Sequence, residues 1–229
     1  YLKQTEVTDL IIEDDKVTGV KDNLDLIYKA DAVIICTGTY LGGKVFIGKK
    51  TFQSGPDGLK AATELSKNLR EKGIYLRRFK TGTPARVNMR SLDQDKMVIQ
   101  RGDEKVVPFS FMSDDISKEQ VPCWLTYTNN ETHELILDNL QETALFGGEI
   151  EGVGPRYCPS IEDKINRFSD KNRHQLFIEP EGNYTNEMYV QGMSTSLPLP
   201  LQEAFMQTIK GLENVEIMRP AYAIEYDCI

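Results

Sequence analysis

The chain has 229 residues, of which 40% are hydrophobic and 27% are charged, proportions that are typical of a water-soluble globular protein. Its formal net charge of −8 argues against strong non-specific binding of the whole chain to nucleic acid, because such binding requires an excess of basic side chains. No apolar run approaches the roughly 18 residues that a membrane-spanning helix requires, so no contact with a membrane is expected.

The first residues of the chain and its cysteines indicate whether it is part of a longer protein and in which cellular compartment it lies. The first residue is Tyr1 rather than methionine, and the opening residues resemble the inside of a strand, so we expect a part of a longer protein without a signal peptide. The two histidines and the wide cysteine spacing argue against a zinc site and favour reduced thiols in a cytoplasmic protein. The cysteines are Cys36, Cys123, Cys158 and Cys228.

The first 40 residues predict strands and a ligand-binding loop. Residues 5–22 alternate β-branched and polar side chains around a polar turn at 14–16, which predicts a hairpin, and residues 24–29 predict a third short strand. The continuous apolar run at 33–36 predicts a buried parallel strand. The loop at the carboxyl end of such a strand is where open α/β sheets bind ligands, and here it consists of Thr37, Gly38 and Thr39.

A glycine-rich segment follows. Residues 41–58 predict loops, and residues 59–72 predict a helix that ends at Gly73. The expected buried face of this helix consists of Leu59, Ala62, Leu65 and Leu69. In the turn before the helix, free N–H groups and the Ser54 hydroxyl suit a ribose or a pyrophosphate, although an ordinary helix-capping loop has the same composition.

Residues 74–78 predict a strand that leads into a turn at 81–83. Lys80 and Arg86 lie on either side of this turn, an arrangement that suits an anionic cofactor or a folate tail. A structural crossover between two domains is the alternative. Since the pattern changes here from α/β to strand-rich, we expect a domain boundary near residue 82.

The remaining elements follow from alternation, turn residues and helical periodicity. Residues 97–112 predict a hairpin with its tip at 101–104, and residues 121–128 predict a strand. A helix at 131–142 is expected to be capped from the Asn129-Asn130 pair, with His133 on its exposed side. Further elements are predicted as follows: strands at 175–182 and 186–190, a Ser/Thr-rich loop at 192–198, a helix at 201–210, and strands at 214–218 and 222–227.

Two groups of basic residues contrast with the acidic balance of the chain. One extends from Arg70 to Arg90 and the other from Lys164 to Arg173. A solvated face is the ordinary explanation for each group, and a patch that contacts phosphates is the alternative.

The most specific signal surrounds Cys158. A stiff loop is predicted by the glycines and prolines Gly152, Gly154, Pro155 and Pro159. Ser160 and Asp163 then fit a capping box at the start of a helix with an apolar face, which consists of Ile161, Ile165 and Phe168. Cys158 is therefore expected just before a helix N-terminus, where free N–H groups, the macrodipole and Arg156 favour a thiolate. A small buried cysteine beside a tight turn is the plain alternative.

The sequence at 154–168, GPRYCPSIEDKINRF, resembles the signature of the MnmG (GidA) family, flavoproteins that modify the wobble uridine of certain tRNAs. The resemblance covers essentially the whole chain, which corresponds to a middle portion of a family member. It implies an α/β fold with part of an FAD-binding Rossmann-like domain at 1–82. An inserted α+β domain on the nicotinamide and substrate side would occupy 83–218, and a strand at 219–229 would return to the first domain. The G-x-G-x-x-G fingerprint that opens such a domain is not in the sequence.

The resemblance also implies cofactors, partners and site residues. The family uses FAD, NADH and methylene-tetrahydrofolate as a carbon donor, and acts as a dimer with the GTPase MnmE on C5 of the wobble uridine of tRNA. Cys158 matches a family cysteine proposed to add to C6 of that uridine. Flavin contacts are implied at Thr37, Gly38, Thr39 and Ser54, with Lys80 beside an anionic group. The nicotinamide segment is implied at Gly154, Pro155, Arg156, Tyr157, Cys158, Pro159, Ser160, Ile161, Glu162, Asp163, Lys164, Ile165, Asn166, Arg167 and Phe168.

Two other functions compete with this one on the residues alone. A hydrolase or transferase that uses Cys158 as its nucleophile needs a nearby base, and the histidine candidates are His133 and His174. A non-catalytic RNA-binding module is the second alternative. The acidic balance of the chain and the lack of aromatic residues between the basic ones argue against it.

Overall fold

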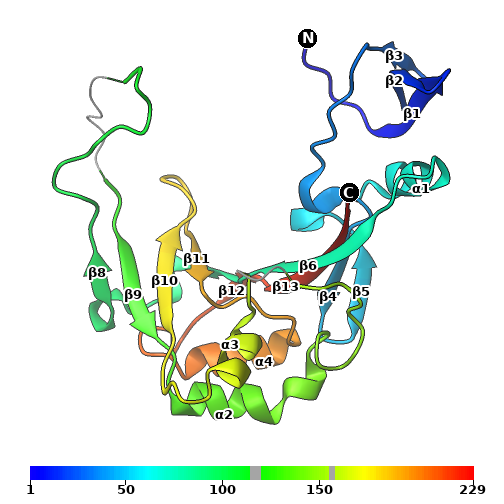
Figure 1. The fold of residues 1–229 in the computed structure, drawn as a ribbon. Coiled ribbons are helices and arrows are strands. Elements are labelled where there is room, and N and C mark those ends of the chain that lie inside the picture. The colour runs from blue at the N-terminus through cyan, green and yellow to red at the C-terminus, as the bar shows by residue number, and fades with distance from the viewer. Residues whose placement is uncertain (114–119, 155–157) are drawn as a thin grey trace.

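The computed structural model describes residues 1–113, 120–154 and 158–229. In these residues the chain forms three β-sheets and four α-helices (Figure 1). The named strands pair with one another only in antiparallel fashion within these ranges. The mixed α/β class expected from the sequence is confirmed.

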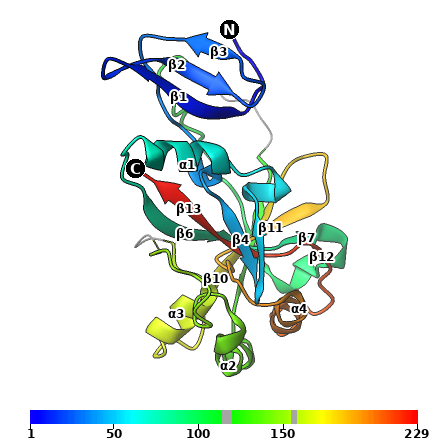
Figure 2. The same cartoon turned by 90° about the vertical axis from the view of Figure 1, so that its right-hand side faces the viewer.

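A three-stranded sheet opens the chain. It consists of β1 (Val7–Glu13), β2 (Lys16–Asp22) and β3 (Ile27–Lys29), in that order. The turn residues Asp14 and Asp15 have φ angles of 48° and 60°, which a tight two-residue hairpin turn requires. The predicted hairpin and third strand are therefore confirmed. In Figure 2 this sheet lies above α1 (Thr63–Glu71), and the two elements share a small apolar core made by Leu10, Leu41, Leu65 and Leu69.

The predicted buried strand at 33–36 is wrong. This segment belongs to none of the three sheets, Ile34 is 86% exposed and Cys36 is exposed. A central strand needs neighbours that accept its backbone hydrogen bonds, and no strand among the described residues pairs with this run. The chain continues into a short 3-10 helix at Gly38–Tyr40, and Gly38 has a φ of 51°.

A four-stranded sheet follows, in the order β5-β4-β13-β6. Its strands are β4 (Lys44–Ile47), β5 (Lys50–Gln53), β6 (Arg77–Thr83) and β13 (Tyr222–Cys228). The loops expected over 41–58 are therefore wrong in part, because β4 and β5 form a hairpin there. The predicted turn at 81–83 is also wrong, since β6 runs straight through it. Gly82 allows β13 to approach closely, and a Cβ at this position would lie 3.0 Å from the carbonyl oxygen of Tyr222.

Helix α1 begins later than predicted, at Thr63. Pro56–Gly58 forms a 3-10 turn instead, and Leu59, expected in the buried face, is 57% exposed. The reason is local, because the Leu59 carbonyl accepts the Gly55 N–H at 2.7 Å and closes a tight turn. Gly73 follows the helix with a φ of 81°, as predicted for its end.

A six-stranded sheet has the order β12-β7-β11-β10-β9-β8. Its strands are β7 (Arg86–Asn88), β8 (Val98–Gln100), β9 (Cys123–Tyr127), β10 (Gln175–Pro180), β11 (Glu187–Gln191) and β12 (Ile217–Arg219). The hairpin predicted over 97–112 is wrong, because β8 pairs with β9 and residues 105–112 form no strand. Pro108 lies in that second half and has no N–H for a ladder. The predicted pairing of β10 with β11 is confirmed.

Three helices lie on one side of this sheet, at the bottom of Figures 1 and 2. They are α2 (Asn130–Asp138), α3 (Ile161–Arg167) and α4 (Leu199–Gln207), and they bury side chains such as Ile136, Ile161 and Phe205 against Leu176 and Val190. Short 3-10 turns lie at Met89–Ser91, Gln94–Lys96 and Leu140–Glu142.

The expectation of an exposed His133 in α2 is wrong. The residue is only 7% exposed, and its Nε2 lies 2.7 Å from the Thr128 hydroxyl. The predicted cap of α2 from the Asn129-Asn130 pair is provided by Asn129, and Thr132 completes a capping box that was not predicted.

The chain enters the six-stranded sheet between β6 and β7 and returns to the four-stranded sheet between β12 and β13. These changes lie close to the domain boundaries proposed near residues 82 and 219, which stay predictions. Among the described residues, no helix has both the length and the apolar character that crossing a bilayer requires.

Candidate active site

The glycine-rich segment before Cys158 lies along the edge of β6. Val153 bridges to Phe79 in parallel orientation, its carbonyl accepts the Lys80 N–H at 3.1 Å, and its own N–H donates to the Arg78 carbonyl at 3.3 Å. An edge strand offers such unpaired backbone groups, and this segment uses those of β6. The motif is therefore fixed in register with a strand from a distant part of the sequence.

A buried carboxylate holds the same segment from the other side. Glu225 in β13 is 3% exposed, and its Oε1 accepts the N–H groups of Glu151, at 2.6 Å, and Gly152. Its second oxygen lies 3.5 Å from Nε of Arg78, which balances the charge. Gly152 is required here, because a Cβ would lie 2.9 Å from the backbone of Phe79.

Cys158 follows, half-buried and without a disulfide. Its sulfur lies 3.1 Å from the hydroxyl of Thr81 in β6. The three preceding residues, Pro155, Arg156 and Tyr157, were predicted to belong to the site and lie outside the described residues. The structure thus brings Cys158 to the edge of β6, further along that strand than the point where Val153 pairs with Phe79.

The predicted capping box at the start of α3 is confirmed. Ser160 Oγ accepts the Asp163 N–H at 3.3 Å, and Asp163 Oδ2 accepts the Ser160 N–H at 3.4 Å. The Ile161 N–H donates to the Ser194 carbonyl at 2.8 Å. The N–H groups of Ser160, Ile161 and Asp163 are therefore engaged by the protein itself, and the described partner of the Cys158 sulfur is a hydroxyl group.

Lys80 places a positive charge beside the cysteine. The residue is 3% exposed, and its Nζ lies 3.8 Å from Asp163 Oδ2, while Arg167 Nη2 lies 3.9 Å from Asp163 Oδ1. Both Lys80 and Cys158 line a hollow of about 130 Å³, together with Leu145, Val153, Gly154, Pro159, Asp163 and Arg167. They also line a much narrower one beneath the Ser194–Ser196 loop. The predicted role of Lys80 next to an anionic group is compatible with this position.

Glu162 is the most deeply buried acid of the motif, with 1% of its surface exposed. Burial raises the pKa of this carboxyl, against the opposing effects of its own backbone N–H and the Lys80 charge. One oxygen accepts the Ser196 N–H at 3.3 Å, and the other has no partner among the described residues. Glu162 therefore connects the motif helix to the 194–196 loop that lines the narrower hollow.

The other residues of α3 divide into an inner and an outer face. Ile161 and Ile165 are buried in the core, whereas Asn166, Arg167 and Phe168 are exposed, so the predicted apolar face ends one turn early. Lys164 Nζ donates to the Gly192 carbonyl at 2.9 Å. Burial lowers the pKa of Lys164, and a negative charge on Cys158 would oppose that change.

The predicted flavin contacts form a second group. Gly43 lies between two of them, because a Cβ there would be 2.6 Å from the Ser54 carbonyl oxygen and 3.0 Å from that of Thr39. The Ser54 hydroxyl is used locally, with the Gly55 carbonyl at 2.9 Å and the Leu59 carbonyl at 3.2 Å. Space is open around Gly38, where a Cβ would meet nothing within 4 Å. Thr37 is half-buried, and its carbonyl accepts the Tyr40 N–H.

Ser54 and the cysteine motif lie at opposite edges of one sheet. Ser54 directly follows β5, whereas Cys158 lies beside β6, and the two strands are separated by β4 and β13. Three strand spacings correspond to about 14 Å. The structure therefore places the cysteine motif with Lys80 at one edge and Ser54 at the other, whereas the turn at Gly38–Tyr40 contacts β13, which lies between these edges.

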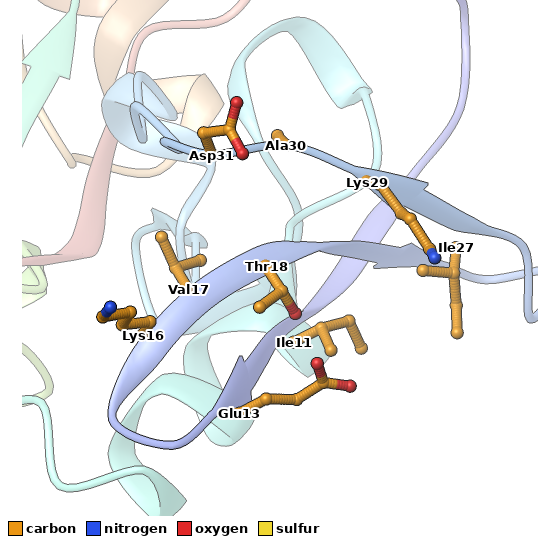
Figure 3. Close-up of a pocket in the computed structure, with 9 residues that line it drawn as sticks. All are labelled: Ile11, Glu13, Lys16, Val17, Thr18, Ile27, Lys29, Ala30 and Asp31. Atoms are coloured by element: carbon orange, nitrogen blue, oxygen red, sulfur yellow. The ribbon is translucent and has the colours of Figure 1, made fainter.

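A separate hollow of about 800 Å³ lies on the N-terminal sheet (Figure 3). It is lined by residues of β1, β2 and β3 such as Glu13, Lys16 and Lys29, and by none of the predicted site residues. Over the described part of the chain, no group of three or more His, Cys, Asp or Glu side chains is arranged to hold a metal ion.

Three contributors to the site were missed in the sequence. Thr81 was assigned to a turn, while Glu225 and Tyr222 were assigned only to a closing strand, although Tyr222 lines the narrower hollow beside Cys158. Glu225 could have been recognised in the sequence, because two acidic residues, Glu225 and Asp227, lie among the apolar residues of β13. Inward-facing acids in a buried strand indicate a structural or functional task.

Comparisons with known proteins agree with the geometry. The family model described as glucose inhibited division protein A, GidA, matches residues 1–229. The chain is 58% identical over 228 residues to the tRNA uridine 5-carboxymethylaminomethyl modification enzyme MnmG of Caldicellulosiruptor saccharolyticus, and 57% identical to the enzyme of that name from Clostridium botulinum. Each match covers 100% of this chain and 36% of the relative, so the chain spans about a third of these proteins.

Solved structures give the same result. The chain superimposes on Aquifex aeolicus GidA with a TM-score of 0.91 and 49% identity, over 100% of this chain and 39% of that one. A second crystal form of the same protein gives 0.90 and 45%.

Proposed function

This chain belongs to the glucose inhibited division protein A (GidA) family, and from that premise we propose that it is part of an enzyme that modifies uridine in tRNA. The observation that carries the proposal is the 58% identity, over the complete chain, to an enzyme named for that reaction. Because this chain covers only 36% of that relative, the activity is proposed for the full-length protein.

We propose Cys158 as the nucleophile. C5 of uridine is a poor nucleophile until a thiolate adds to C6, which moves the C5–C6 electron pair toward the C4 carbonyl as an enolate. C5 then forms a bond to a one-carbon electrophile. Loss of the C5 proton expels the sulfur and restores the double bond. The hollow beside Cys158, with a buried Lys80 at its wall, supports a reaction that passes through anions at this place.

For the flavin, Thr37, Gly38 and Thr39 fit a contact role, because the space around Gly38 is open. Ser54 fits less well as a donor, since its hydroxyl is already turned toward carbonyl groups of its own turn. A bound flavin would supply electron transfer, with NADH as the source of hydride and methylene-tetrahydrofolate as the carbon donor.

For the nicotinamide segment, the Ile161 and Asp163 N–H groups at the start of α3 are not open to a pyrophosphate, because Ser194 and Ser160 accept them. The exposed side chains Asn166 and Arg167 and the half-buried Lys164 are the part of the segment that fits such a role. We further propose that the full-length protein is a cytoplasmic dimer that acts on tRNA together with the GTPase MnmE.

The direct test uses nucleoside mass spectrometry. tRNA from cells that lack the full-length gene is compared with tRNA from the same cells carrying the gene on a plasmid. We expect the mass of the modified wobble uridine only in the complemented cells. An unmodified uridine in both samples, with the protein present at normal level, would reject the proposal.

The alternative of a Cys–His hydrolase receives no support from the contacts. His133 bonds to Thr128 and packs against His174, and among the described residues no hydrogen bond joins either ring to Cys158. A cysteine nucleophile of that class requires its base within hydrogen-bond reach.

A further inference from the structure

We propose that Thr81 is a positioning residue for Cys158, which donates its hydroxyl hydrogen to the sulfur and holds the thiolate at the edge of β6. This inference rests on the proposed role of Cys158 as a nucleophile. The observation behind it is the 3.1 Å separation of Thr81 Oγ1 and Cys158 Sγ, two atoms whose residues are 77 positions apart in the chain.

The place of Thr81 is fixed by strand pairing. Thr81 lies opposite Ile224 of β13, and its neighbour Gly82 lies opposite Ala223, where a Cβ would lie 3.0 Å from the Tyr222 carbonyl oxygen. On the cysteine side, Ser160 begins α3 two residues after Cys158, and Val153 pairs with Phe79 of β6. A hydroxyl on a rigid strand and a thiol between two anchored points therefore meet in a defined geometry, which is what preorganisation of a nucleophile requires.

The chemistry of the pair indicates which atom donates. A thiol is a weak donor, whereas a thiolate is a charged acceptor, and a hydroxyl both donates and accepts. In the described residues, Cys158 is the one hydrogen-bond partner found for the Thr81 side chain, so its hydrogen is available for the sulfur. The ammonium group of Lys80, which lines both hollows beside Cys158, adds a positive charge that favours the same direction.

The neighbouring hydroxyl group is already used. Ser160 Oγ lies 3.2 Å from Asp163 Oδ2, to which it can donate, and it accepts the Asp163 N–H. Ser160 is therefore committed to the helix cap, and Thr81 is the side chain that can respond to the charge of the sulfur.

The test measures thiol reactivity and not tRNA modification. Full-length protein is pulsed with isotopically labelled iodoacetamide from pH 5 to 10, and the labelled fraction of the tryptic peptide YCPSIEDK is read by mass spectrometry. This peptide spans residues 157–164 and contains only Cys158. The peptide with Cys36, which lies outside the motif, serves as the internal reference in each digest.

The variants are Thr81→Val, Thr81→Ser and, as the matched control, Thr83→Val. Thr83 lies on the same strand, and its hydroxyl contacts Arg86 instead of the cysteine. Loss of a hydrogen bond to a charged group changes the equilibrium between the charged and the neutral form by a factor of about ten or more. The labelled fraction of the Cys158 peptide rises with pH, and the midpoint of this rise is compared between the proteins. We expect Thr81→Val to slow the labelling of Cys158 by about that factor at pH values below the midpoint. We also expect it to move the midpoint to higher pH by about one unit. Thr81→Ser and Thr83→Val are expected to keep the original profile.

An unchanged profile in Thr81→Val overturns the proposal. A midpoint at lower pH overturns it as well, because the threonine would then accept from a neutral thiol. An equal shift in Thr81→Ser shows that packing and not the hydroxyl is responsible, and so also overturns it. The proposed role of Cys158 as the nucleophile fails separately, if Cys158→Ser retains full modification of tRNA.

Discussion

The imidazole rings of His133 and His174 pack against each other, with their centroids 5.3 Å apart and their planes inclined by 36°. They are the two histidines of the chain. Burial lowers the pKa of both rings, and the pKa of His174 is lowered further by positive charge on His133 and Lys164. Nε2 of His174 is buried without a hydrogen-bond partner in the described residues. The surroundings of the two rings therefore favour their uncharged form.

This pairing predicts a loss of stability in mild acid. The folded pKa values lie below the ordinary value of 6.5, so the unfolded chain binds more protons as the pH falls through 6.5. The stabilisation is present above pH 6.5 and is lost as the pH falls below it. Urea unfolding at pH 7.5 and 5.5 measures the effect, and His174→Gln is expected to reduce the difference. An equal difference in the variant would contradict the role of the pair.

For Glu162 we predict the opposite dependence of stability on pH. Burial raises its pKa, so the folded state binds more protons than the unfolded one above pH 4.5. The stability that the protonated acid contributes is therefore lost as the pH rises from 4.5 through the folded pKa. Glu162→Gln, which stays neutral, is expected to become more stable relative to the unaltered protein between pH 4 and pH 7. The exposed Glu203 of α4 offers a control, since Glu203→Gln should leave the pH dependence unchanged.

Cys158→Ser in the full-length protein is expected to retain its flavin absorbance near 450 nm and to lose tRNA modification, because a serine hydroxyl is a far weaker nucleophile at neutral pH. Cys36→Ser is the control, since Cys36 is exposed in a segment outside the sheets. Equal modification by the Cys158→Ser protein and the control would remove Cys158 from the mechanism.

Lys164→Met is expected to weaken the use of reduced nicotinamide more than the binding of flavin. Stopped-flow reduction of the bound flavin at increasing NADH concentration gives the apparent affinity. Arg156→Ala should have the same effect, although Arg156 lies outside the described residues. Glu203→Gln on α4 provides a variant distant from the motif in sequence, and the idea fails if all three proteins show one concentration dependence.

Ser160→Ala tests the helix cap beside the cysteine. Loss of the hydroxyl that accepts the Asp163 N–H is expected to cost about 0.5–2 kcal/mol of unfolding free energy. Ser169→Ala, at an exposed position just after α3, should change the unfolding free energy by less than about 0.5 kcal/mol. Urea unfolding of the two variants at the same pH gives the comparison.

Local signals predicted a large part of this fold. The hairpin turn at Asp14 and Asp15, the caps at Asn129 and Ser160, and the pairing of β10 with β11 depend on residues close in sequence. The wrong predictions occur where the local structure depends on pairing with a strand that is distant in the sequence. Residues 81–83 were predicted as a turn because nothing near them in sequence indicates β13, which pairs with them from the far end of the chain.

The candidate site divides in the same way. The cysteine, its loop and the cap were predictable because they occupy one contiguous stretch. The contacts of Thr81 with Cys158 and of Glu225 with Gly152 were not, since they form only through the pairing of β6 with β13 and with the motif segment. The apolar run at 33–36 was misread because hydrophobicity alone does not supply a neighbouring strand.

The position of β13 between β4 and β6 has a consequence for synthesis on the ribosome. A chain that emerges from its N-terminus completes the six-stranded sheet once Arg219 is free, while β4 and β6 still lack the strand between them. Their facing edges then stay unpaired, and Glu225 is not yet available to hold the cysteine segment. Nascent protein therefore lacks the Glu225 anchor of the cysteine segment until β13 emerges, and the open strand edges are places where a chaperone can bind in that interval.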